Sequence, residues 1–236
     1  MPLSLSYQIY PLGESAITIE FGKKIDAGIN NIVLSLFHYL QEKKITGVTD
    51  IIPAYSSLSV IYDAILIRAQ PGISSAFLFI KQQIEKAVAE CDGVATTNTG
   101  ILEIPVCYDV SFGMDLDELA QQKNMSTDAV IQMHCSKTYR VYMIGFLPGF
   151  AYMGSVDESI ATPRRAQPRT RVPAGSVGIA GEQTGIYPLD SPGGWNIIGR
   201  TPVKMFDAKR DNPVLLKPGD EVRFVAVDME EFLRMG

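Results

Sequence analysis

The sequence predicts an α+β protein in which two helices on an antiparallel sheet are followed by a small β-barrel. The N-terminal part alternates between the two-residue hydrophobic repeat of strands and the repeat of three to four residues that is typical of helices. The C-terminal part has many short strand-like runs between corners rich in Gly and Pro, as small barrels do.

The N-terminal part reads as strand, strand, helix, strand, strand and helix. In the second strand Ile17 and Ile19 alternate with small or polar neighbours, which is the period of a half-buried strand. Asp26 is the expected N-cap of the first helix, and Gly47 lies just past its end. The predicted strands are 7–10, 16–21, 48–54 and 58–62, and the second helix is predicted over about 74–90.

A polar segment rich in Gly and Thr, 91–100, then interrupts the periodic pattern. Domain boundaries fall in such segments because few contacts cross them. We therefore predict an N-terminal domain at residues 1–95 and a C-terminal domain at residues 100–236.

The C-terminal part begins with a predicted strand and a pair of helices. Asp115, with Glu118 three residues later, resembles a capping box for the first helix of the pair. The pair also resembles a helix-turn-helix, but its second helix offers Asp128, Gln132 and His134 instead of basic side chains. We therefore predict that it caps the barrel and does not read DNA. The predicted strands are 101–108, 139–144, 175–180, 184–188, 196–199, 203–207 and 221–227, and the helices are 116–122, 127–135 and 229–235.

Composition and charge narrow the function classes. The 236 residues carry a net charge of −5, which argues against general binding to nucleic acid or to anionic membranes. The N-terminus has no signal-peptide pattern, and no apolar run approaches the length of a bilayer span. Cys91, Cys107 and Cys135 form no CxxC pair, so reduced thiols are expected. The sequence therefore predicts a cytoplasmic globular protein.

The stretch 144–202 carries most of the information about function. It holds ten of the 20 glycines and seven of the 14 prolines, interleaved with aromatic residues. Polar groups on stiff, irregular backbone around aromatic side chains suit a binding or catalytic cleft. Tight barrel corners also require Gly and Pro, so we expect a barrel with one face made into a site. The aromatic residues are Phe146, Phe150, Tyr152, Tyr187 and Trp195.

Four arginines form a positive island inside this stretch. They lie within eight residues, and no acidic residue occurs between Glu158 and Glu182. Arg makes forked contacts to carboxylate and phosphate, so the island suits an anion. A solvated loop, or arginines that bond barrel carbonyls, fits the same residues. The four are Arg164, Arg165, Arg169 and Arg171.

His134 and a polar cluster complete the candidates. His134 lies near the end of a predicted helix, where it suits an acid, a base or a hydrogen-bond donor. A lone histidine is more often a satisfied structural residue, and the residues alone favour that interpretation. His38 is expected on the surface. The cluster that would line a small pocket is Gln183, Thr184, Tyr187, Ser191 and Trp195, with Arg200 nearby.

Several motifs are absent from the sequence. It has no GxxxxGK[ST] phosphate loop, and AGSVG at 174–178 fails the GxSxG elbow at its first glycine. Two histidines and three separated cysteines give little support to a zinc site. We therefore expect the chain to act with a partner or a second subunit.

Long runs of the chain resemble a known family. They are PLGESAITIEFG, IIPAYSSLSVIYD, YMIGFLPGFAYMG, VPAGSVGIAGEQTGIYP and SPGGWNIIGRTP. Together they resemble the 5-oxoprolinase B-subunit family, also described as the kinase A inhibitor (KipI-like) or allophanate hydrolase subunit 1 family, over essentially the whole chain. The resemblance implies an α+β N-terminal domain and a cyclophilin-like β-barrel C-terminal domain.

The resemblance implies one of two roles. In the first, the protein is the B subunit of a bacterial ATP-dependent 5-oxoprolinase and is inactive alone. It would act with a carboxyltransferase-like C subunit, and with an A subunit, using ATP with Mg²⁺ to open 5-oxoproline to glutamate. In the second, it inhibits autophosphorylation of a sporulation sensor histidine kinase, with residues 146–152 as an exposed apolar anchor.

Residue chemistry then assigns roles within the first reading. Arg169 and Arg171 would hold a carboxylate or phosphoryl group, and His134 would assist proton transfer. Gln183, Thr184 and Tyr187 would orient the substrate amide. The remaining substrate-binding candidates are Phe150, Trp195 and Arg200.

Overall fold

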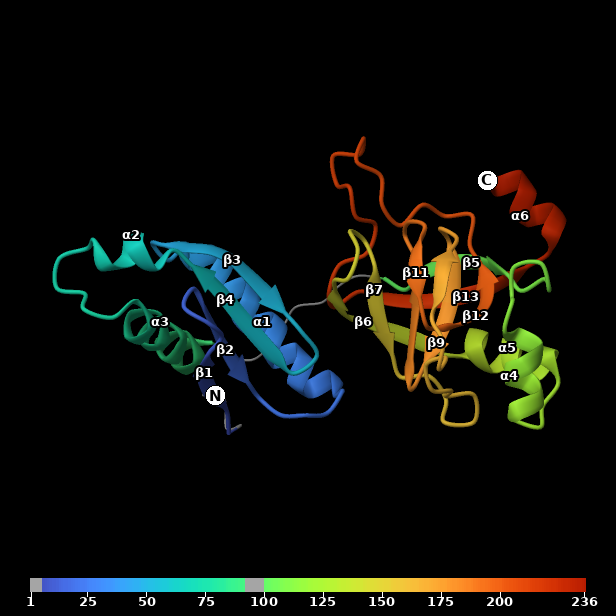
Figure 1. The fold of residues 1–236 in the computed structure, drawn as a ribbon, viewed down its shortest axis with the longest axis horizontal. Coiled ribbons are helices and arrows are strands. Elements are labelled where there is room, and N and C mark those ends of the chain that lie inside the picture. The colour runs from blue at the N-terminus through green and yellow to red at the C-terminus, as the bar shows by residue number, and fades with distance from the viewer. Residues whose placement is uncertain (1–5, 92–99) are drawn as a thin grey trace. The chain divides into compact units, whose positions relative to one another are not determined.

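The chain forms two units, residues 1–97 and 98–236, in a computed structural model that describes residues 6–91 and 100–236 (Figure 1). The predicted boundary segment, 91–100, lies almost entirely outside the described residues. The domain limits 1–95 and 100–236 therefore stay predictions. None of the helices in the described ranges has the length and apolar character that a membrane span needs.

Unit 1 is built on a four-stranded antiparallel sheet in the order β1-β2-β4-β3. Alternate residues of the two central strands, among them Ile17, Ile19, Leu58 and Val60, are fully buried. This period explains why the two strands were predicted from the sequence. The strands are β1 (Gln8–Pro11), β2 (Ala16–Glu20), β3 (Val48–Pro53) and β4 (Ser57–Tyr62).

Two long helices, α1 (Ala27–Lys43) and α3 (Ala76–Glu90), contact each other and the sheet. Asp26 caps α1 as predicted, because its carboxylate accepts a hydrogen bond from the backbone N–H of Ile29 at 2.9 Å. The short helix α2 (Ala64–Arg68) was not predicted. Its N-cap is Asp63, which accepts hydrogen bonds from two backbone N–H groups, and five residues are too few to show a helical period.

Unit 2 is a closed barrel with the strand order β10-β7-β6-β13-β5-β12-β9. Beside it a separate two-stranded sheet pairs β11 with β8. All pairs in the barrel are antiparallel except β13 with β5. The strands are β5 (Leu102–Cys107), β6 (Thr138–Ile144), β7 (Ala151–Gly154), β8 (Arg169–Val172), β9 (Ser176–Ala180), β10 (Gln183–Ile186), β11 (Ser191–Gly193), β12 (Asn196–Arg200) and β13 (Glu221–Val227).

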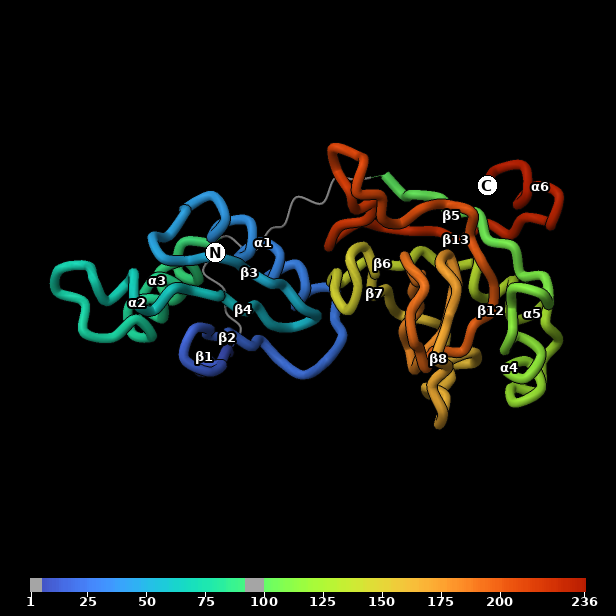
Figure 2. The backbone as a smooth tube through the Cα atoms, turned by 45° about the horizontal axis from the view of Figure 1, so that its top comes forward, coloured from blue at the N-terminus to red at the C-terminus, as the bar shows by residue number. Residues whose placement is uncertain are grey.

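Helices α4 (Leu116–Gln122) and α5 (Thr127–Ser136) lie side by side against the barrel (Figure 2). Leu119 and Val130 are buried in the same apolar cluster as the barrel interior. The pair therefore covers the barrel, as predicted. A short helix, α6 (Met229–Met235), follows the last strand and has no buried residue.

Three local predictions were wrong or incomplete. Residues 203–207 form no strand, because Asp207 bonds the following turn and only Phe206 makes an isolated bridge, to Val214. The capping box at Asp115 does not form, because its carboxylate binds arginines instead of the helix N-terminus. The short strands β7, β8 and β11 were not predicted, since three or four residues show too little alternation.

Candidate functional site

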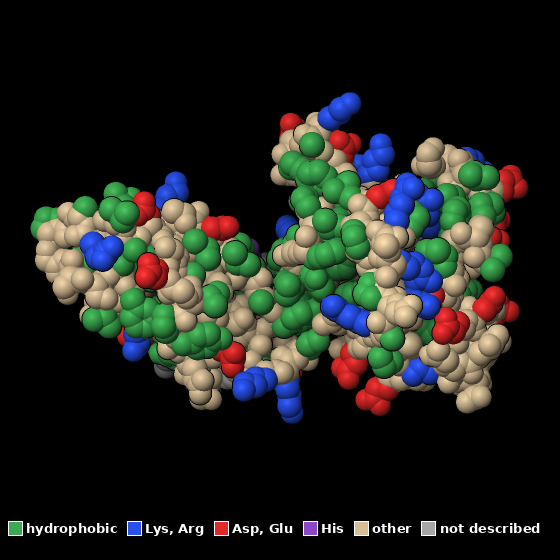
Figure 3. All heavy atoms as spheres, in the orientation of Figure 1, with side chains coloured by type: hydrophobic (Ala, Val, Ile, Leu, Met, Phe, Trp, Pro, Cys, Tyr) green, Lys and Arg blue, Asp and Glu red, His purple; other side chains and the backbone are tan. Residues whose placement is uncertain are grey.

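The arginine island lies in unit 2, on the loop 163–168 and on the strand β8 that follows it. The loop is fastened at two points: Asn196 Nδ2 donates to the carbonyl of Pro163 at 2.8 Å, and the backbone N–H of Arg165 donates to the carbonyl of Gly194 at 2.8 Å. Figure 3 shows several Lys and Arg side chains gathered over one face of this unit, with acidic side chains near them. The backbone that carries the arginines is therefore held in place before any ligand arrives.

Asp115 is the centre of the island. Its side chain is 2% exposed, and Arg169 makes a forked contact to its two oxygens at 2.6 and 2.8 Å. Arg165 Nη1 donates to the same carboxylate at 2.5 Å, and the backbone N–H of Ile197 donates to it at 2.7 Å. These donors replace the water that the buried carboxylate loses and so offset the cost of its desolvation. Asp115 therefore joins the start of α4 to the arginine loop and to β12.

Two of the arginines also form ion pairs with exposed acidic side chains. Arg165 contacts Glu118 at 3.0 Å, and the hydrogen bond to Glu118 followed by the charge of Asp115 raises the pKa of Arg165. Arg171 pairs with Asp190 at 2.7 Å at the surface. Asp190 also accepts the backbone N–H of Ala174, and these two contacts lower its pKa.

These contacts change the predicted roles of two arginines. Arg169 and Arg171 each pair with a carboxylate of the protein: Arg169 with the buried Asp115, and Arg171 with Asp190 at the surface, so a ligand would have to compete with these carboxylates. Arg164 differs, because it makes no ion pair with any residue in 6–91 or 100–236. Its guanidinium carbon lies 6.0 Å from the centre of the Trp195 ring, within the range of a cation–π contact.

A hollow of about 420 Å³ opens beside Arg164. Residues 162–167 form much of its wall, and Glu118, Gln122 and Asn196 complete it. Guanidinium, amide and carboxylate groups line it, which suits a small polar ligand.

Beneath Arg164 lies an aromatic cluster of Phe150, Tyr187 and Trp195, all less than 5% exposed. Phe150 meets Trp195 edge to face at 5.3 Å and Tyr187 at 5.3 Å. Two glycines permit this packing: a Cβ on Gly193 would lie 2.4 Å from the Tyr187 hydroxyl, and one on Gly185 would lie 3.0 Å from the Trp195 ring. The three aromatic residues thus form a wall, and their predicted contact with a substrate is not supported because they are buried.

His134 lies in a second buried polar centre of unit 2. Its Nε2 is 2.9 Å from the Thr184 hydroxyl and its Nδ1 is 2.7 Å from the Tyr108 hydroxyl, and neither His134 nor Thr184 is exposed. Thr184 donates to the carbonyl of Gly178, so it accepts from Nε2–H, and Tyr108 donates to Nδ1. Burial lowers the pKa of His134 to about 3.

The geometry does not support the predicted contact of His134 and Thr184 with a substrate. Both side chains are inside the barrel unit and satisfy one another. Arg200 also has another partner, since its Nε donates to the carbonyl of Ala174 at 2.9 Å and its guanidinium lies over Phe112. Gln183 is half-buried on β10. The structure therefore does not gather the predicted polar cluster in one pocket.

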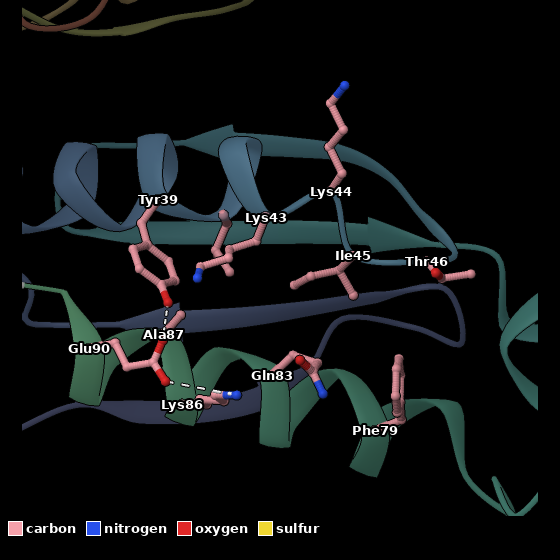
Figure 4. Close-up of a pocket in the computed structure, with 11 residues that line it drawn as sticks. Tyr39, Lys43, Lys44, Ile45, Thr46, Phe79, Gln83, Lys86, Ala87 and Glu90 are labelled. Atoms are coloured by element: carbon pink, nitrogen blue, oxygen red, sulfur yellow. Dashed lines mark hydrogen bonds and ion pairs between the residues drawn. The ribbon is translucent and has the colours of Figure 1, made fainter.

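Unit 1 has a hollow of its own, of about 310 Å³, between α1 and α3 (Figure 4). The Tyr39 hydroxyl and the Glu90 carboxylate point toward one another across it and are hydrogen-bonded. Lys86 pairs with Glu90, and Lys43 lies over the Tyr39 ring. Four of its polar side chains thus interact with one another, and it contains none of the predicted candidates. Within the described ranges, no group of three or more His, Cys, Asp or Glu side chains is placed to hold a metal ion.

Comparison with known proteins identifies the family. Residues 7–216 match the family described as carboxyltransferase domain, subdomain C and D. The chain belongs to this family. It is 43% identical to the B subunit of 5-oxoprolinase from Bacillus subtilis (strain 168) over 232 residues, which are 98% of this chain and 97% of that protein. It is 38% identical to the B subunit of 5-oxoprolinase from Escherichia coli O157:H7 over 216 residues, 92% of this chain and 94% of that protein. The predicted membership of the 5-oxoprolinase B-subunit family is thereby confirmed.

Two solved structures of similar fold belong to longer chains, and this chain aligns with a part of each. TTHA0988 aligns with a TM-score of 0.78 and 36% identity over 90% of this chain, but the chain spans only 40% of TTHA0988. The urea carboxylase of Kluyveromyces lactis aligns with a TM-score of 0.76 over 97% of this chain and 22% of that enzyme. Its identity is 21%, so this likeness concerns the fold alone.

Proposed function

We propose that the chain is the B subunit of a bacterial ATP-dependent 5-oxoprolinase, which hydrolyses 5-oxoproline to glutamate. One observation carries the proposal: 43% identity to a protein named as the B subunit of 5-oxoprolinase, with 98% of this chain and 97% of the relative aligned. Neither chain therefore has a large segment that the other lacks. The work of this chain is then to contribute a polar, cationic surface to a site shared with its partners.

The proposal includes the partners that the family resemblance implies, namely a carboxyltransferase-like C subunit, together with an A subunit. The alignment with TTHA0988 is the observation that fits a partner, because there the same fold is 40% of a longer chain. The chain by itself would be inactive. The proposal also includes the fold of the family, with a cyclophilin-like barrel as unit 2 and two helices on an antiparallel sheet as unit 1. It further includes a cytoplasmic location.

ATP and Mg²⁺ belong to the assembled complex in this proposal. Mg²⁺ prefers carboxylate oxygens together with substrate phosphates. The carboxylates of the hollow and the island, Glu118, Asp115 and Asp190, each pair with a guanidinium group, so the candidate site of this chain does not fit the metal. ATP, when bound to the assembled complex, would activate the amide oxygen.

The roles of the site residues follow from their contacts. Asp115 holds Arg165 and Arg169, and these fix the loop that presents Arg164 at the hollow. His134 and Thr184 brace the barrel behind it. Opening a lactam places negative charge on the amide oxygen, and preorganised cations and N–H donors stabilise such charge. In this proposal the arginine loop is the part of the chain that faces the substrate.

The test is ATP hydrolysis stimulated by 5-oxoproline, measured with this chain together with the A and C subunits and with each component omitted. We expect turnover only when all three are present. Formation of a complex without turnover of 5-oxoproline would mean that the substrate is another amide or urea-like compound. Turnover that is equally fast without this chain would refute the proposal.

A second function, inhibition of a sensor histidine kinase, is favoured by one observation. Phe146, in the loop between β6 and β7, is 62% exposed and has a backbone φ of 69°, a conformation that side chains rarely adopt. An exposed aromatic side chain held in this way suits a protein partner. If no complex with the A and C subunits forms, binding to the helices of a sensor kinase is the next measurement, with Phe146→Ala as the variant that should lose it.

A further inference from the structure

Arg164 is held between two fixed residues. The carbonyl of Pro163 accepts a hydrogen bond from Asn196, and the backbone N–H of Arg165 donates to the carbonyl of Gly194. The Arg165 side chain is also fastened, to Asp115 and Glu118. The backbone on either side of Arg164 therefore costs little further conformational entropy to order when a ligand binds.

The Arg164 side chain itself is exposed and lies near an aromatic surface. Its guanidinium is 6.0 Å from the centre of the Trp195 ring. Its charge also reaches the hydroxyls of Tyr152 and Tyr187: burial raises the pKa of both, and Arg164 opposes that rise. A guanidinium held over an indole by a cation–π contact still has N–H groups to donate to a planar anion.

The other arginines of the island are already paired. Arg165 and Arg169 bind Asp115, and Arg171 binds Asp190. Arg164 has no such carboxylate among the described residues, although it borders the same hollow. The protein thus compensates three of the four charges and leaves one at the mouth of a polar hollow of about 420 Å³.

We propose that Arg164 binds the carboxylate of a small amide-bearing acid in this hollow, with the buried Trp195 ring behind its guanidinium. The inference rests on the proposed function, in which 5-oxoproline is such an acid. A monocarboxylate fits better than a polyphosphate, because Glu118 also lines the hollow and repels a group with several negative charges. Gln122 and Gln167 lie in the same wall and are suited to hydrogen-bond an amide.

The experiment uses the fluorescence of Trp195, which is the only tryptophan in the chain. The full chain is titrated with 5-oxoproline, with its neutral carboxamide and with acetate, for wild type and for Arg164→Gln. The matched control is Arg223→Gln, an exposed arginine of unit 2 that pairs with Glu103 at 2.8 Å, away from the island. Thermal melting of each variant checks that it is folded.

We expect a saturable change with 5-oxoproline in wild type and Arg223→Gln, and at least about tenfold weaker binding in Arg164→Gln, because a charge-assisted hydrogen bond is lost. The carboxamide should bind at least about tenfold more weakly than the acid to wild type. Equal binding by Arg164→Gln and wild type, or no saturable change in wild type, would overturn the proposal.

The same variants separate this proposal from the proposed function. If the assembled complex fails to turn over 5-oxoproline while the chain still binds carboxylates through Arg164, the enzyme assignment fails and the carboxylate site stands. If the complex is active and Arg164→Gln leaves both binding and the KM for 5-oxoproline unchanged, the enzyme assignment stands and the carboxylate site fails.

Discussion

Unit 2 contains two buried polar centres that are stabilised in opposite ways. Asp115 has an exposed fraction of 1% and His134 of 0%, so burial alone does not distinguish them. Asp115 has two guanidinium groups and a backbone N–H as partners. Among the described residues, the hydrogen-bond partners of the His134 ring are the neutral hydroxyls of Tyr108 and Thr184.

The difference shows what a buried ionisable group requires. A charge survives in the interior when opposite charges and hydrogen bonds replace its water, as at Asp115. Without a charged partner the neutral form is favoured, which is why burial lowers the pKa of His134 to about 3. The first centre therefore positions the cationic loop, whereas the second centre joins α5 to the barrel.

The largest effect is expected from Asp115→Asn, which removes the charge of the first centre and keeps its shape. Arg165 and Arg169 would then lose their shared counter-charge. Breaking a buried ion pair costs roughly 3–5 kcal/mol, but the side chains of Arg165 and Arg169 are 29% and 24% exposed, so we expect about 2–4 kcal/mol. Denaturant unfolding of unit 2 measures the loss.

The matched control for that experiment is Glu103→Gln. Its partner, Arg223, forms a surface pair with it at 2.8 Å, and such pairs contribute less than about 1 kcal/mol. Equal losses for Asp115→Asn and Glu103→Gln would show that the first centre does not depend on charge.

Acid should affect the second centre by a smaller amount. The unfolded chain protonates His134 below its ordinary pKa of 6.5, whereas the folded protein does so only at about 3. The contribution of His134 is therefore complete above pH 6.5 and is lost as the pH falls from 6.5 toward 3. At about pH 5 the loss is about 2 kcal/mol, from roughly 1.36 kcal/mol per pKa unit.

The measurement is the free energy of unfolding of wild type and of His134→Gln at about pH 7 and about pH 5. The change with pH in wild type minus the change with pH in His134→Gln gives the contribution of His134. A pH dependence that persists unchanged in His134→Gln would assign it to other groups.

Local patterns in the sequence predicted most of the elements but few of the site contacts. The helix that Asp26 caps and the strand with Ile17 and Ile19 were predicted because period and cap lie within a few neighbouring residues. The pairing of Asp115 with Arg165 spans 50 residues. No local pattern reports such a contact, so the acidic residue nearest the island was interpreted as a helix cap.

Because the sequence does not report contacts between distant residues, it could not assign the partners of the candidate site residues. The structural interpretation of His134 was favoured by residue type alone, and its burial agrees with that. The island was predicted as an anion site, as a solvated loop or as arginines that bond barrel carbonyls. Arg169 instead binds the carboxylate of Asp115, and Arg164 makes no ion pair within the described residues, so the anion site stays a prediction. The sequence could not separate them, because their difference depends on which arginine faces Asp115 across the fold.

The smallest effect is expected from Thr184→Val, which leaves the His134 ring in place but removes the acceptor of its Nε2–H at 2.9 Å. Valine has nearly the same shape as threonine, so the change removes only the hydrogen bonds of the hydroxyl, the one from His134 and the one to the carbonyl of Gly178. A buried donor left without an acceptor costs about 1–2 kcal/mol, less than the loss of a charge at the first centre. The control is Thr138→Val, an exposed threonine on β6, for which we expect a change within about 0.5 kcal/mol. If Thr184→Val destabilised unit 2 as much as Asp115→Asn, the second centre would be as costly to disrupt as a buried ion pair, and the distinction between the two centres would fail.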